Sequence, residues 1–274
     1  MPPISIIGCG WLGLPLARHF AELGHPVLGS TTRSEKLPLL QQAGVTPHLL
    51  KLTPHSDLDG HPLLNARVAV VTIPPSKGDG KPRFYLHQMA HLATAIEASA
   101  IEKLVFISAT SVYPQNNREV TEADAERIES PFSDCPWLDI EACFTSLKRV
   151  ATTVVRFSGL IGGDYQPGRY FSGRELGGAD DPVNMIHRDD CIGIISAIIE
   201  QGAWGEVFNA SACEHPSRRE LYSRSCELAG LAPPIFIADP RPYRLVNCDK
   251  LKRQLGYRFR HPNPVDALGL NWAP

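Results

Sequence analysis

The sequence predicts an α/β protein built on a doubly wound parallel sheet, with a small α/β lobe at its C-terminal end. Over the first half of the chain, short β-branched apolar runs alternate with segments of helical period, as they do in βαβ units. Residues 68–73 are almost entirely apolar, which is typical of a strand buried on both faces of a parallel sheet. Beyond residue 158 a glycine-rich stretch and shorter elements replace this alternation and indicate the second lobe.

The first half contains strands and helices in regular order. We predict strands over residues 4–7, 27–30, 45–52, 68–73, 103–108 and 151–157 from their β-branched apolar runs. Apolar residues at helical spacing predict helices over residues 11–23, 34–43 and 84–100, and near 137–149. Ser34 is the predicted N-cap of the second helix, and Gly24 and Gly44 end the first two helices.

The elements of the second half are shorter. Residues 159–178 are glycine-rich and are predicted to form a loop. A short apolar run over 182–186 leads to a helix that Asp189 or Asp190 caps and that ends near Gln201. A strand over 207–210 and a helix over 217–229 follow. We therefore expect the sheet domain at residues 1–160 and about 188–210, and the small lobe at about 161–187 and 211–274.

Length and charge narrow the range of functions. The 274 residues are enough for one large domain or two coupled ones. Lys and Arg number 27 against 29 Asp and Glu, a balance that argues against a nucleic-acid-binding face and a polybasic membrane surface. No apolar stretch approaches the length of about 18 residues that a membrane span needs, and the Met-Pro-Pro start lacks the basic region of a signal peptide. We expect a cytoplasmic protein with no nucleic-acid or membrane partner.

A glycine motif lies between the first strand and the first helix. Gly8, Gly10 and Gly13 match the pattern G-x-G-x-x-G, with Trp11 and Leu12 between the last two glycines. The motif alone is weak, but its place between a strand and a helix is that of a dinucleotide-binding Rossmann domain. There the three glycines permit a tight turn, the approach of a pyrophosphate and close helix packing, and the phosphates bind the helix N-terminus. The alternative is a glycine turn that binds nothing.

The end of the second strand predicts which dinucleotide binds. An NAD site usually carries an Asp or Glu there for the ribose 2′-hydroxyl, whereas this chain has no acid before Glu35. The hydroxyls of Thr31 and Thr32 and the guanidinium of Arg33 favour the 2′-phosphate of NADP. NAD is the alternative, in which Arg33 stacks on adenine or faces water.

Two further strand ends complete the predicted cofactor site. Ile73 and Pro74 end the fourth strand, and Ser108 and Ala109 end the fifth. Ligands of open α/β sheets bind at the carboxyl ends of the strands. No metal site is predicted, because the seven cysteines are scattered without any Cys-x-x-Cys pair.

Six sequence blocks carry a resemblance to a known family. They are GCGWLG at 8–13, SATSVY at 108–113, VVRFSGLIGG at 154–163, VNMIHRDDC at 183–191, VFNAS at 207–211 and LKRQLGY at 251–257. In this order they resemble the extended short-chain dehydrogenases/reductases (SDRs), in particular the NAD-dependent epimerase/dehydratase-like proteins of the atypical YeeZ-like subgroup. The resemblance covers essentially the whole chain. It implies a Rossmann domain, a small substrate lobe with the ligand cleft between the two, and a homodimer through two helices beside the sheet.

The chain departs from this family at the catalytic residues. Active members use a Ser or Thr, a Tyr, and a Lys four residues after the Tyr that lowers the Tyr pKa during hydride transfer. None of the seven tyrosines of this sequence is followed by a lysine at that spacing. In the helix expected to carry the pair, the matching residues are Cys135 and Asp139, or Trp137 and Glu141, and the serine position is Ala109.

Four residues remain as candidates for chemistry and substrate binding. Tyr113 and His187 are the catalytic candidates, with an anchoring tyrosine and a structural histidine as the respective alternatives. Arg169 and Asn184 fall where the family holds its substrate, and Arg169 suits a carboxylate or phosphate.

Two functions follow from these candidates. The first is an atypical NADP(H)-dependent reductase or epimerase-like enzyme acting on a polar, nucleotide-linked small molecule. The second is a catalytically inactive NADP(H)-binding sensor. The persistence of Arg169, Asn184 and His187 favours the enzyme, while the missing Tyr and Lys suit both functions equally.

Overall fold

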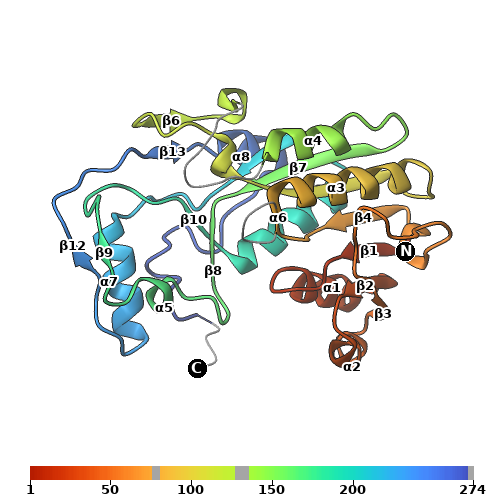
Figure 1. The fold of residues 1–274 in the computed structure, drawn as a ribbon, viewed down its shortest axis with the longest axis horizontal. Coiled ribbons are helices and arrows are strands. Elements are labelled where there is room, and N and C mark those ends of the chain that lie inside the picture. The colour runs from red at the N-terminus through yellow and green to blue at the C-terminus, as the bar shows by residue number, and fades with distance from the viewer. Residues whose placement is uncertain (76–80, 127–135, 271–274) are drawn as a thin grey trace. The chain divides into compact units, whose positions relative to one another are not determined.

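The computed structural model describes residues 1–75, 81–126 and 136–270 (Figure 1). The chain divides into two compact units. The first unit comprises Met1–Ala109, Glu129–Val155 and Ile195–Val207, and the second comprises Thr110–Ile128, Arg156–Ile194 and Phe208–Pro274. The divisions pass through two strands of the sheet and one helix, so they lie at other residues than the predicted lobe boundaries.

A seven-stranded sheet with the order β11-β7-β5-β4-β1-β2-β3 forms the centre of the α/β fold. Its strands are β1 (Ile4–Ile7), β2 (Val27–Thr31), β3 (Thr46–Leu49), β4 (Val68–Val71), β5 (Lys103–Ala109), β7 (Ala151–Phe157) and β11 (Val207–Ala210). The pairs β1–β2, β1–β4, β2–β3 and β4–β5 are all parallel. The chain runs from β1 to β2 and β3 on one side and then returns to β4 on the other. This reversal confirms the doubly wound prediction and makes the carboxyl end of β1 the point where ligands of such sheets bind.

Helices connect the strands of this sheet. They are α1 (Gly13–Glu22), η1 (Ser34–Lys36), α2 (Leu37–Gln42), η2 (Pro62–Leu64), α3 (Lys81–Glu97), α4 (Trp137–Thr145) and α6 (Arg188–Gln201). Within the first unit, α3 and α4 run side by side in Figure 1. No helix in the part of the chain that the structure describes is long and apolar enough to cross a membrane.

The core of the first unit packs α3 and α4 against the sheet. Met89 from α3 and Ile140 and Phe144 from α4 are fully buried together with Phe106 from β5. The rings of Phe106 and Phe144 stack with their centroids 4.6 Å apart. These contacts fix α4, and with it every polar side chain that α4 carries toward the end of β5.

The second unit is built from short two-stranded ladders and helices. The strands pair in parallel as β6 (Arg118–Val120) with β13 (Arg244–Val246), β8 (Gly159–Ile161) with β10 (Met185–His187), and β9 (Glu175–Leu176) with β12 (Ile235–Phe236). The helices are η3 (Thr110–Val112), η4 (Glu122–Asp124), α5 (Pro167–Phe171), α7 (Arg218–Leu228) and α8 (Asp249–Leu255). Helix α5 packs directly on α7 at Gly168. A Cβ at this position would overlap the backbone of Ser225 and Cys226, so only glycine allows so close an approach. The Phe171 and Tyr222 rings stack beside this contact at 4.1 Å.

Two local expectations were wrong. Ser34 does not cap a helix, because it begins η1 and α2 starts only at Leu37. The physical reason is Pro38, which lacks an N–H and is tolerated in the first turn of a helix but not in its interior. The predicted loop over 159–178 contains β8, α5 and β9, each too short to give a periodic sequence pattern.

The stacked ring pair gives a stability prediction. Replacing Phe144 by Ala removes a fully buried aromatic ring and should cost about 3–5 kcal/mol in the free energy of unfolding. Leu39→Ala is the matched control, because Leu39 is an exposed apolar residue of α2 and its loss should cost less than about 0.5 kcal/mol. Urea denaturation followed by circular dichroism measures both. Equal losses in the two variants would contradict the packing described for α4.

Candidate functional site

The glycine loop between β1 and α1 is held by two neighbouring strands. Gly8 has φ +113°, a conformation that glycine adopts without strain. Its N–H donates to the Ser30 hydroxyl of β2 at 2.8 Å, and its carbonyl accepts from the Thr72 hydroxyl beyond β4 at 2.6 Å. The Cys9 N–H donates to the Ser30 carbonyl at 2.7 Å. The loop therefore has a fixed shape without any ligand.

The other two glycines of the motif differ in their surroundings. A Cβ at Gly13 would lie 2.1 Å from the Gly8 carbonyl oxygen and 2.8 Å from the Thr72 hydroxyl, so only glycine allows α1 to approach the loop this closely. A Cβ at Gly10 would meet no atom within 4 Å. Gly10 thus borders open space, which is where the motif places a pyrophosphate.

The start of α1 is suited to an anion. Among the described residues no side chain caps α1 at Leu12, and no acidic residue lies in its first turn. The unpaired N–H groups and dipole of a helix N-terminus attract phosphate. Cys9, inside the loop, is not a reactive thiol, because burial raises its pKa to about 12.

The predicted 2′-phosphate residues lie at the end of β2. Thr31 is buried at the last position of the strand, and its hydroxyl accepts the Arg33 N–H at 3.3 Å. Thr32 and Arg33 are exposed. The Arg33 side chain is 59% exposed, and its contact with Glu35 is a long 3.8 Å, so the guanidinium is open to an anion.

The remaining cofactor candidates lie at the ends of the next two strands. Ile73 and Pro74 follow β4, and the Ile73 carbonyl accepts from the Tyr85 hydroxyl at 2.7 Å. Ser108 and Ala109 end β5. Since β2, β1, β4 and β5 are parallel neighbours, their carboxyl ends lie along one edge of the sheet. The structure thus brings together all the residues predicted to bind the cofactor.

A buried hydrogen bond that the sequence analysis did not predict lies at the end of β5. The Ser108 hydroxyl donates to the Glu141 carboxylate of α4 at 2.6 Å, and both residues are buried. This length is typical of a hydroxyl bound to a charged carboxylate. The sequence allowed two alignments for the missing Tyr and Lys. The alignment of Trp137 and Glu141 puts Glu141 at the lysine position, and the structure places this residue at the Ser108 hydrogen bond. The other alignment uses Cys135, which lies outside the described residues.

Tyr113 lies in a polar network within the second unit. Its buried hydroxyl donates to the Asn209 side-chain oxygen and accepts from the Arg156 guanidinium at 2.7 Å. Arg156 also donates to the Glu122 carbonyl at 3.2 Å. Both roles of the Tyr113 hydroxyl are therefore occupied, an arrangement that favours an anchoring tyrosine.

Asn184 and Arg169 have contrasting environments. The Asn184 side chain pairs with the backbone of β13, donating to the Arg244 carbonyl at 2.8 Å and accepting from the Val246 N–H at 2.9 Å. Arg244 in turn donates to the Tyr113 carbonyl at 2.7 Å, which links Asn184 and Tyr113 through one arginine. Arg169, by contrast, lies on α5 and is exposed.

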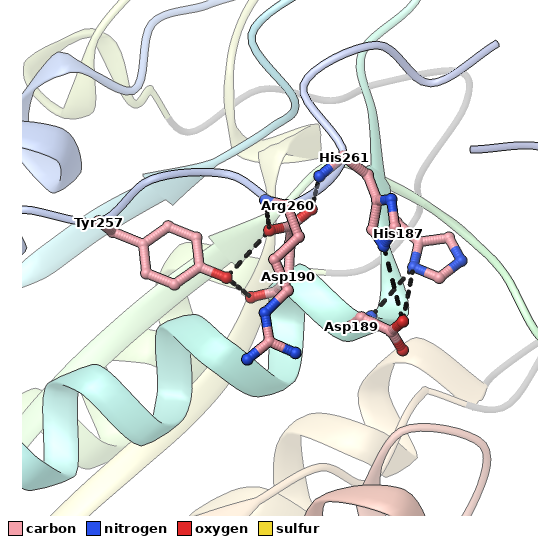
Figure 2. Close-up of polar contacts among 6 residues, drawn as sticks. All are labelled: His187, Asp189, Asp190, Tyr257, Arg260 and His261. Atoms are coloured by element: carbon pink, nitrogen blue, oxygen red, sulfur yellow. Dashed lines mark hydrogen bonds and ion pairs between the residues drawn. The ribbon is translucent and has the colours of Figure 1, made fainter. Parts of the chain in front are cut away.

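His187 is fully buried at the end of β10, beside Asp189 and His261 (Figure 2). Its Nδ1 accepts the Asp189 N–H at 3.2 Å and lies 3.6 Å from the Asp189 carboxylate. Burial is the main cause that lowers the His187 pKa. The expectation that Asp189 or Asp190 caps the following helix was wrong, because α6 begins at Arg188 and includes both.

Asp190 binds a distant part of the chain instead. Its carboxylate accepts the Arg260 N–H at 2.7 Å, the His261 N–H at 3.0 Å and the Tyr257 hydroxyl at 2.9 Å. The Tyr257 pKa is raised by burial and by this carboxylate. Asp190 thereby fastens the segment around residues 257–261 to the start of α6.

The glycines of the loop give a prediction that separates packing from binding. Gly13→Ala should lower the free energy of unfolding by about 1–3 kcal/mol, because the new methyl group overlaps the Gly8 carbonyl. Gly10→Ala should change it by less than about 0.5 kcal/mol, because the methyl group points into open space. Chemical denaturation of both variants measures the difference. Equal stability of the two would show that α1 does not approach the loop as described.

Comparisons with known proteins extend over almost the whole chain. No model of a known protein family matches the sequence. The chain is 28% identical to the protein YeeZ of Escherichia coli K12, covering 97% of this chain and 98% of YeeZ. A solved structure from Methylobacillus flagellatus, assigned to but not established as an NAD-dependent epimerase/dehydratase, is 25% identical with a TM-score of 0.72, covering 98% of this chain and 97% of that one.

A structure with bound ligands has the same fold. MoeE5 in complex with UDP-glucose and NAD aligns with a TM-score of 0.80 at 17% identity, covering 97% of this chain and 96% of MoeE5. The parallel sheet, the glycine loop after β1 and these full-length similarities all indicate the same Rossmann-type fold. The chain is thus similar to YeeZ over almost its whole length, and it has the Rossmann-type fold found in NAD-dependent epimerases and dehydratases.

Proposed function

We propose that the first unit binds NADP(H) along the carboxyl ends of β1, β2, β4 and β5. The observation that carries the proposal is the preformed glycine loop, in which Gly8 and Gly13 are required by packing while Gly10 borders open space. The pyrophosphate would lie over Gly10, Trp11 and Leu12 at the uncapped start of α1. The strand ends Ile73–Pro74 and Ser108–Ala109 would line the remainder of the site. MoeE5, which shares the fold, binds NAD.

The end of β2 supports NADP over NAD. Residues 30–34 include no acid for a ribose 2′-hydroxyl, and the only nearby one, Glu35, is exposed and faces Arg33. Arg33 would bind the 2′-phosphate through charge-assisted hydrogen bonds, with Thr31 and Thr32 beside it.

Arg33 therefore provides the test of cofactor choice. Arg33→Ala should weaken NADPH binding about 10- to 100-fold and leave NADH binding unchanged, because a hydrogen bond to a charged group contributes about 1.5–3 kcal/mol. Titration of the protein with each nucleotide, followed by the fluorescence of Trp11 and the other tryptophans, measures this. Arg67→Ala is the control, since Arg67 is also exposed but pairs with Glu102 at 2.6 Å. Equal loss of NADH and NADPH binding would contradict the role of Arg33, and binding of neither by the native chain would refute the site.

We further propose that the protein is an atypical reductase or epimerase/dehydratase-like enzyme for a polar, nucleotide-linked small molecule. MoeE5 binds UDP-glucose, which suggests the substrate class. Arg169, exposed on α5, would receive an anionic group of the substrate. A bound NADP(H) would supply or accept a hydride.

Residues of this chain would carry out the proton transfer that accompanies hydride transfer. The hydroxyl of Ser108 already donates to Glu141, so it can take a proton from a substrate hydroxyl while passing its own proton to the carboxylate. Tyr113 and His187 are the other candidates. Tyr113 must first give up its bond to Asn209 in order to donate a proton elsewhere.

One observation favours the second function, an NADP(H) sensor without turnover. The hydroxyl of Tyr113 is held by Asn209 and Arg156 inside the second unit, and His187 is fully buried. Ser108 and Glu141 would then only fix α4 to the end of β5. Either function is compatible with a homodimer, which we propose to form through α3 and α4. A groove beside these two helices is lined in part by the small residues Ala90, Thr94 and Ala98.

A panel of UDP-sugars with NADP⁺ and NADPH separates the two functions. If the protein is an enzyme, Glu141→Gln and Ser108→Ala should each reduce turnover about 10²- to 10⁴-fold, the usual contribution of a general acid–base group, and Glu141→Gln should not weaken NADPH binding. Tyr113→Phe should reduce turnover less than tenfold. Initial rates of absorbance change and product analysis measure these effects. Tight NADPH binding with no turnover by the native chain would favour the sensor.

A further inference from the structure

Three potential ligand side chains of the second unit meet at the start of α6 (Figure 2). His187 comes from the end of β10, Asp189 from the first turn of α6, and His261 from the segment that follows α8. The Asp189 Oδ2 lies 3.6 Å from His187 Nδ1 and 3.6 Å from His261 Nε2. One ligand atom from each residue lies within 4.8 Å of the other two.

We propose that His187, Asp189 and His261 form a binding site for a divalent transition-metal ion of the zinc class. Imidazole nitrogens with one carboxylate oxygen are a common set of three protein ligands for Zn²⁺, with a fourth position open to water. In a tetrahedral zinc site with bonds of about 2.0–2.1 Å, neighbouring ligand atoms are about 3.4 Å apart. The two nitrogen–oxygen distances of 3.6 Å are close to this value. Only the two imidazoles would have to move closer together.

The protonation of His187 suits this role. Its Nδ1 accepts the backbone N–H of Asp189, so this nitrogen carries no proton, and its lone pair is directed at that N–H. A metal ion would replace that 3.2 Å hydrogen bond. The Nε2 of His187 is buried and has no hydrogen-bond partner among the described residues.

Packing holds the His187 ring, and a hydrogen bond holds the backbone of His261. The His187 ring lies against the backbone of Gly162, where a Cβ would come within 2.4 Å of Nε2, and the φ of +108° at Gly162 also requires glycine. The backbone of His261 is fixed by its N–H bond to Asp190 at 3.0 Å. Supporting hydrogen bonds of this kind orient metal ligands and strengthen their sites.

Two of the three side chains of the cluster reach solvent. His187 is fully buried, whereas the side chains of Asp189 and His261 are 29% and 19% exposed. An ion can therefore enter from the side of these two residues, where water can fill the fourth position. Figure 2 shows the Arg260 guanidinium pointing away from both imidazole rings, so its charge does not face the cluster. The bound ion would join the start of α6 to the segment around residue 261.

Titration of the tag-free protein with Co²⁺ tests the proposal. We expect one Co²⁺ per chain, the visible absorption of a four-coordinate ion, and displacement by Zn²⁺. His261→Gln and Asp189→Asn, which alter the two partly exposed ligands, should each weaken binding at least about 10- to 100-fold. His55→Gln is the control and should bind as the native chain does, because His55 is an exposed histidine of the first unit.

A thermal shift provides an independent measurement. Zn²⁺ that binds the folded chain should raise Tm of the native protein and of His55→Gln, but not of the two ligand variants. Circular dichroism without metal shows whether those variants are folded. The proposal is overturned if the native chain takes up no stoichiometric Co²⁺, or if the ion binds His261→Gln and Asp189→Asn as tightly as the native chain.

Discussion

The close approach of α1 to the glycine loop is the contact on which the rest of the first unit depends. Gly13 lies so near the Gly8 carbonyl that no side chain fits, and the Thr72 hydroxyl bonds the same carbonyl from the next strand. One small residue thereby fixes the direction of the helix relative to β1, β2 and β4. Because the first turn of α1 begins at this contact, its N–H groups face the same edge at which the parallel strands end. The shape of the loop and the place where α1 begins are thus consequences of packing.

The chemistry at that edge differs from the family pattern in the sign of its charge. In one of the two alignments with the family pattern, Glu141, which is buried and bonded to Ser108, stands at the position of the lysine that favours the ionised form of a tyrosine. A carboxylate there would raise the pKa of a neighbouring tyrosine, so it cannot take over the role of the lysine. It can, however, accept a proton through the serine. The sequence thus has no tyrosine followed by a lysine at the family spacing, and the structure places a Ser108–Glu141 hydrogen bond at the end of β5.

Sequence patterns predicted the sheet well, because a strand can be recognised from a run of neighbouring residues alone. The bounds of β1, β7 and β11 agree with the predicted ranges, since each strand carries a short run of β-branched or other apolar residues. Short elements were missed, because the two to five residues of β9, β8 and α5 show no period. The Ser108–Glu141 bond spans 33 positions, and His187 and His261 are 74 positions apart in the sequence. No spacing rule connects such residues, so contacts of this kind follow only from the folded chain.

The second unit is held together in a different way. Its ladders are short, and its three chain segments are joined by buried polar contacts: Tyr113 with Arg156 and Asn209, Asn184 with β13, and Asp190 with the backbone around residue 261. Each buried polar group costs free energy unless it is bonded, so such networks specify one arrangement of the segments and tolerate few substitutions. The four residues singled out from the sequence in this unit then separate by exposure. Tyr113, Asn184 and His187 belong to the framework, whereas Arg169 is exposed on α5. Substitutions at the three framework positions should therefore destabilise the second unit more than a substitution at Arg169.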